Sequence, residues 1–133
     1  MATQGFPAAG VIADHVMAWF TGANGTTPAS NSNPIPVGHN TTGIGHGVKT
    51  VAAAGTDEAL AASTAAKWVT IQAQTDNTGI MAVGAAGVDA TVATGTGVAL
   101  VAGAHITLPC DNLADIFVDA TVTGDGVRFT YGT

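Results

Sequence analysis

Residues 67–74, KWVTIQAQ, alternate two chemically different sets of side chains. One set is apolar and consists of Val69, Ile71 and Ala73. The other set begins with an aromatic residue and is otherwise polar, and it consists of Trp68, Thr70, Gln72 and Gln74. Alternation with a period of two is typical of a β-strand that has one buried face and one exposed face. We therefore expect a strand here, with its second face meeting water or a partner.

The chain after this strand contains further short apolar segments that are separated by Gly-, Asn- and Asp-rich turns. We expect strands at 48–54, 67–74, 80–83, 98–102, 105–108, 115–120 and 127–131, and a weak edge strand or a loop at 88–93. The turn signal TDNTG at 75–79 predicts that strand 80–83 forms a hairpin with strand 67–74. Seven or eight short strands with this spacing predict an all-β domain, a β-sandwich or a jelly-roll-like barrel, at 48–133.

Residues 1–47 differ in composition from the rest of the chain. They contain no Lys or Arg, a single acid (Asp14) and four of the five prolines. Their Gly/Pro/Asn/Ser/Thr-rich part, 22–47, predicts an extended N-terminal arm. Within 8–20, apolar residues recur at helical spacing, which predicts a short helix that packs on its own domain or on a neighbour. A short strand is the third possibility for this segment.

The charge balance excludes some classes of partner. The net charge is −6, and the only cations are Lys49, Lys67 and Arg128, so we expect no nucleic-acid partner. No apolar run approaches the roughly 18 residues of a membrane helix, and the N-terminus has no basic region typical of a secretory signal. Only 9% of residues are charged. Either another chain covers much of the surface, or hydroxyl and amide groups keep the protein soluble.

Residues that could carry chemistry are present but scattered. His39 and His46 could share a metal ion, although two loose ligands seldom define a site. Three oxygen-rich groups, Asp76-Asn77, Asp111-Asn112-Asp115 and Asp119-Asp125, lack calcium-loop spacing, and bonds to their own backbone explain Asp and Asn in turns. Ser63 and Cys110 lack a clear base, although His105 precedes Cys110 by five residues. We expect no enzyme activity, no metal and no cofactor.

Three stretches resemble small virion proteins of tailed bacteriophages: KWVTIQAQTDNTGIMAVG (67–84), GVALVAGAHITLP (97–109) and LADIFVDATVTGDGVRFTYGT (113–133). The resemblance covers about two thirds of the chain. It implies a β-sandwich head-decoration or cement protein, a homotrimer on the outer surface of the capsid, bound to the major capsid protein. The arm would then make the partner contacts, through its apolar residues Phe6, Val11, Ile12, Val16, Trp19, Phe20, Ile35 and Val37.

The same resemblance leaves a second function open. The chain could be a head-fibre or tail-fibre adhesin that binds a host glycan. Such a module would use exposed aromatic and carboxamide side chains, and the candidates are Trp68, Gln72, Gln74 and Tyr131.

Overall fold

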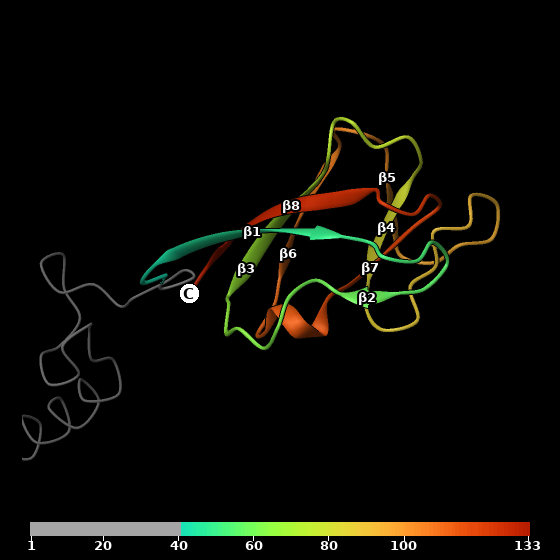
Figure 1. Ribbon diagram of the computed structural model, residues 1–133. Helices are drawn as coiled ribbons and strands as arrows, with labels where there is room; N and C mark the ends of the chain where they lie inside the picture. The colour runs from blue at the N-terminus through green and yellow to red at the C-terminus, as the bar shows by residue number, and fades with distance from the viewer. Residues whose placement is uncertain (1–40) are drawn as a thin grey trace, which may run out of the picture. The chain divides into compact units, whose positions relative to one another are not determined.

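The computed structural model describes residues 41–133, which form eight strands and one short 3-10 helix (Figure 1). The strands are β1 (Ile44–Thr50), β2 (Glu58–Ala59), β3 (Trp68–Ala73), β4 (Met81–Gly84), β5 (Val98–Leu100), β6 (His105–Pro109), β7 (Phe117–Ala120) and β8 (Gly126–Gly132). The helix, η2 (Leu113–Asp115), precedes β7. The helical segment expected at 8–20 and all eight partner-contact residues expected in the arm lie outside the described residues.

The strands form two antiparallel sheets, with the orders β1-β8-β3-β6 and β2-β7-β4-β5. Six antiparallel pairs build them, and four of these are nested: β1 with β8, β2 with β7, β3 with β6, and β4 with β5. In these four pairs the first strand lies beside the last, the second beside the seventh, the third beside the sixth and the fourth beside the fifth. This is the pairing of a jelly roll, in which one long antiparallel ribbon folds over into two sheets. The expected all-β sandwich is confirmed.

Strand β3 has the two faces that its sequence predicts. Val69, Ile71 and Ala73 are fully buried, whereas the intervening side chains are partly exposed. The buried residues join a core between the sheets that includes Met81 and Val83 of β4, Leu113, Val118 and Val127. At ~25 cal/mol per Å² of buried apolar surface, this interior is the main source of stability.

The expected hairpin between 67–74 and 80–83 is wrong. Strand β4 belongs to the other sheet, where it pairs with β5 and β7, and β3 pairs with β6 and β8. The connection crosses between sheets because side chains hold it there. The Asn77 carboxamide exchanges two hydrogen bonds with the backbone of Gly126 (2.8 and 2.9 Å), and the Asp125 carboxylate accepts from the N–H groups of Thr78 and Gly79.

Strand β1 also differs from its expected position, 48–54. It runs from Ile44 to Thr50, and a bent segment follows at 51–56. The sequence places its N-terminal half in the expected arm, because residues 22–47 are rich in Gly, Pro, Asn, Ser and Thr. The structure supplies the reason for Gly45 and Gly47: they pair with Tyr131 and Phe129 of β8, whose rings cover the inward side of β1. Similarly, residues 88–93 form no strand beyond one isolated bridge, between Asp89 and Thr96.

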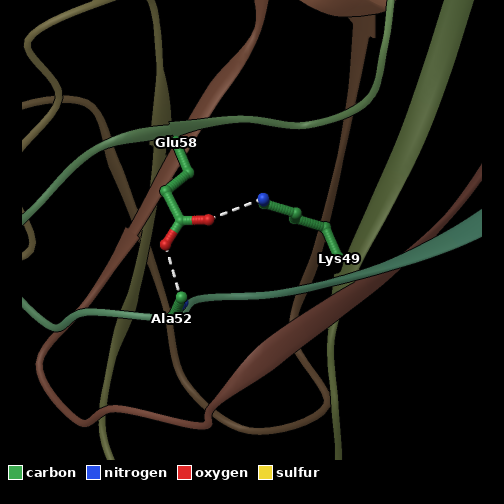
Figure 2. Close-up of polar contacts among 3 residues, drawn as sticks. All are labelled: Lys49, Ala52 and Glu58. Atoms are coloured by element: carbon green, nitrogen blue, oxygen red, sulfur yellow. Dashed lines mark hydrogen bonds and ion pairs between the residues drawn. The ribbon is translucent and has the colours of Figure 1, made fainter.

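An ion pair closes the sandwich between its edge strands β1 and β2 (Figure 2). Lys49 Nζ lies 2.6 Å from Glu58 Oε2, and Glu58 Oε1 accepts a 2.6 Å hydrogen bond from the Ala52 N–H. The Lys49 ammonium, and then the Ala52 N–H, hold the pKa of the Glu58 carboxyl below its ordinary value. Both side chains keep some solvent contact, so the pair contributes modestly, about 1 kcal/mol or less.

We expect Gly47→Val to destabilise the fold by about 1–3 kcal/mol, because overpacking forces neighbouring side chains to move. A Cβ at this position would lie 2.5 Å from Cζ of the buried Phe129 ring. Thr50→Val places the same side chain on the exposed side of the same strand and serves as the matched control. Urea unfolding would measure both variants, and equal stabilities for the two would contradict this packing.

We expect the stabilising effect of Glu58 to depend on pH. Because folding lowers the pKa of this carboxyl, its contribution is present above the ordinary value of 4.5 and is lost as the pH falls through the lowered pKa. The difference in free energy of unfolding between the native chain and Glu58→Gln should therefore shrink as the pH is lowered below 4.5. A Lys49→Met background should remove most of this pH dependence, and an unchanged dependence there would exclude the ion pair as its cause.

Candidate functional site

The outer faces of the two sheets differ in what covers them. Residues 85–97 lie over the β2-β7-β4-β5 sheet, where Val88 and Ala90 pack against Ala82 and Phe117. The buried carboxylate of Asp119 holds this loop by accepting a 2.8 Å hydrogen bond from the Ala90 N–H. The outward side chains of the β1-β8-β3-β6 sheet have substantial exposure instead, so the described residues leave that face accessible.

We call this accessible surface the open face and define it by three cross-strand rows. The strand register sets each row in the order β1, β8, β3, β6. The rows are Ile44–Gly132–Trp68–Pro109, His46–Thr130–Thr70–Thr107, and Val48–Arg128–Gln72–His105. Residues from four separated parts of the chain thus meet on one surface.

Hydrogen bonds fix several side chains of the open face before any ligand binds. The hydroxyls of Thr70 and Thr107 lie 2.7 Å apart across β3 and β6. The Gln72 amide donates a 3.0 Å hydrogen bond to the Gly103 carbonyl, which turns its carboxamide oxygen away from that partner. Side chains that are already positioned lose less conformational entropy when they bind.

Trp68 marks the corner of the open face at which the described chain begins and ends. Its indole lies over Gly132, where a Cβ would collide with the ring, and its Nε1–H donates a 3.2 Å hydrogen bond to Thr41 Oγ1. Thr42 bonds to the Thr133 carbonyl through both its N–H and its hydroxyl. Figure 1 shows the C-terminus beside the start of β1.

The open face contains a shallow hollow with a volume of about 440 Å³. It is lined by His46, Gly47, Val48, Thr70, Gln72, Gln74, His105, Arg128, Phe129 and Thr130. Ligand sites in proteins occupy ~300–1,000 Å³, so the hollow is large enough for a small ligand. Seven of these ten residues have hydrogen-bonding side chains, which favours a ligand with many hydrogen-bonding groups.

Arg128 gives the hollow its electrostatic character. No carboxylate of the described residues lines the hollow, and within 41–133 Arg128 makes no ion pair. The chain as a whole carries a net charge of −6. The open face therefore presents a local positive charge on an acidic protein, with two imidazoles from the outer strands β1 and β6 beside it.

The structure separates the residues proposed for glycan contact. Trp68 and Gln72 share the outward side of β3, Gln74 follows directly after the strand, and both glutamines line the hollow. Tyr131 faces the other way, packs against the core and lies over Gly45, so it is not part of the open face. Arg128 was missed as a candidate. Alternation in 126–132 indicates that it is exposed, but no sequence pattern places it beside Gln72.

Several Asp and Asn side chains accept hydrogen bonds from the backbone, but Asp119 of β7 bonds to distant segments rather than to its own backbone. Asp119 Oδ1 and Oδ2 accept from Gly55 and Ala90 at 3.0 and 2.8 Å, and Asn112 Oδ1 accepts from Thr64 and Ala114. Asp89 accepts from both the N–H and the hydroxyl of Thr91, which lowers the pKa of its carboxyl. Among the described residues, no three His, Cys, Asp or Glu side chains come together as a metal site. His39 lies outside these residues, and His46 lines the hollow.

The two candidate nucleophiles, Cys110 and Ser63, are not among the residues that line the hollow. Burial, followed by the negative charges of Asp111 and Asp115, raises the pKa of the Cys110 thiol, which favours the unreactive protonated form. The Ser63 hydroxyl accepts a 2.9 Å hydrogen bond from the Asn112 amide. Neither arrangement activates its side chain.

Searches of protein-family profiles, curated proteins and solved structures find no match to this chain. Within 41–133, no helix is long and apolar enough to cross a membrane.

We expect Asp119→Ala to destabilise the protein by about 2 kcal/mol, because it leaves the Ala90 N–H without its acceptor and removes one of the two acceptors of the Gly55 N–H. Asp111→Ala, at an exposed position, is the matched control and should change stability little. Thermal unfolding with and without calcium would show whether the Asp119 carboxylate only accepts backbone hydrogen bonds or also binds calcium. A calcium-dependent rise in Tm that Asp119→Ala abolishes would contradict a purely structural role.

Proposed function

We propose that the chain is a capsid decoration protein of a tailed bacteriophage, which binds the major capsid protein on the outer surface of the head and stabilises the particle. The observation that carries this proposal is the fixed corner at which the described chain begins. Residues 41–43 are tied to Thr133 and to Trp68. The forty residues that precede Thr41 are therefore attached to a folded sandwich at one defined point.

The composition of the preceding segment suits an anchor. It carries the apolar residues proposed for capsid contact, and it has no Lys or Arg. Many identical sites on a capsid lattice turn modest contacts into strong association, and a homotrimer would bind such a lattice through three anchors at once.

The jelly-roll fold is compatible with this role but does not select it. Viral capsid and lectin domains both use this architecture, and a fold by itself does not define a function. Support for the capsid role comes instead from the resemblance of three stretches to phage virion proteins, together with the fixed corner.

A second candidate function, a head-fibre or tail-fibre adhesin, is favoured by a different observation. The hollow on the open face brings Gln72 and Gln74 together with Thr70, Thr130 and Arg128. Such a set of hydrogen-bonding side chains suits a glycan. The two functions are compatible in one chain, since the anchor and the open face are formed by different residues.

We expect deletion of residues 1–40 to leave the sandwich folded and to abolish binding to purified capsids, because the described strands begin at Ile44. Deletion of residues 1–47 should instead lower Tm, since it removes half of β1. Circular dichroism and co-sedimentation with capsids would measure the two effects. A 1–40 deletion that binds as tightly as the full chain would show that the anchor lies elsewhere.

The copy number of the chain in purified particles tests the role itself. We expect hundreds of copies per particle on a lattice of threefold sites. A few copies per particle would assign the chain to a vertex, fibre or tail, and its absence from particles would refute a virion role.

A further inference from the structure

We propose that the hollow on the open face binds a carboxylated sugar, such as a sialic or uronic acid, with Arg128 holding the carboxylate. This inference names a ligand class for the glycan-binding candidate and does not depend on the capsid role. It rests on three features of one surface: an accessible hollow, a cation with no ion pair among residues 41–133, and a lining of hydrogen-bonding side chains.

Arg128 is the residue that sets the charge of the ligand. Its planar guanidinium donates two parallel hydrogen bonds to a carboxylate, which gives both attraction and a preferred orientation. It stands in the middle of its row, between Val48 on β1 and Gln72 on β3. An acid bound there meets no protein carboxylate among the lining residues, so its charge is not opposed locally.

The neighbours of Arg128 suit the hydroxyls of a sugar ring. Hydroxyls of Thr70 and Thr130 donate and accept, and the Gln72 carboxamide keeps its oxygen available because its amide donates to Gly103. His46 and His105 border the hollow at the outer strands. A sugar acid needs such mixed donors and acceptors around one fixed charge.

The same lining argues against a protein partner in the hollow. The residues that dominate protein–protein affinity are typically Trp, Tyr and Arg in desolvated apolar pockets. Here Arg128 is surrounded by threonine, glutamine and histidine, and Val48 is the one exposed apolar side chain of the lining. A small polar acid matches these groups better than an apolar protein surface does.

Titration of the full-length chain, labelled with 15N, with methyl glycosides of N-acetylneuraminic acid, glucuronic acid and glucose tests the inference by NMR. We expect the two acids to shift the amide signals of β3 and β8 around Gln72 and Arg128, and glucose to bind at least tenfold more weakly. Arg128→Gln should weaken binding of the acids about tenfold or more, since a hydrogen bond to a charged group is lost. Arg128→Lys keeps the charge but not the forked geometry, so its affinity for the acids should lie between those of the native chain and Arg128→Gln.

The matched control is Lys67→Gln, which removes the same charge at an exposed residue that does not line the hollow. It should leave the affinity for the acids unchanged. If Arg128→Gln and Lys67→Gln lose the same affinity for the acids, the loss follows from net charge alone, and the proposed site is wrong. Equal binding of glucose, or no shift with any glycoside, would overturn the ligand class. Loss of capsid binding by Arg128→Gln without acid binding would identify the hollow as a protein contact instead.

Discussion

The antiparallel register of β8 between β1 and β3 is the constraint on which the rest of the structure depends. It joins the end of the chain to two strands that lie far earlier in the sequence. Side chains alternate along a strand, so a shift of one residue would exchange the two faces of β8. Val127 and Phe129 would leave the core, and Arg128 would enter it. The same register therefore builds the interior and the open face, and neither can change without the other.

Buried polar groups stabilise the long connections that this arrangement requires. Six of the seven links between successive strands pass from one sheet to the other, and such crossings leave backbone N–H groups without strand partners. Asp119, Asp125 and Asn77 supply acceptors at such crossings, for the N–H groups of Gly55, Gly79 and Gly126. Asp119 and Asp125 are buried, and their burial is sustained because their oxygens are hydrogen-bonded. The carboxylates of Asp119 and Asp125, which first suggest ion binding, are thus part of the framework.

The outer faces of the two sheets differ in how the described residues cover them. The loop 85–97 covers one outer face through Val88 and Ala90, whereas the other outer face keeps its rows of side chains accessible. On that face Thr70, Thr107 and Gln72 are held by neighbours, so these side chains are positioned before a ligand binds. The proposed anchor and the proposed sugar site would together allow one small protein to serve a particle and a ligand.

Much of the architecture could be predicted from residue patterns alone. Alternation identified β3 and its buried residues, and the short apolar segments identified β6, β7 and β8 and the all-β class, because a strand with one buried face leaves a period of two in the sequence. The partners of each strand could not be obtained in this way. The turn at 75–79 signals a change of direction, but only its contacts with Asp125 and Gly126 decide that β4 joins the second sheet. Likewise, Gly45 and Gly47 read as loop residues until the rings of Tyr131 and Phe129 are placed over them. Alternation in the sequence predicts the buried and exposed residues of β3 as the structure has them. Which exposed residues share a surface follows from the tertiary structure alone, because pairing between distant strands is set by the packing of the whole core.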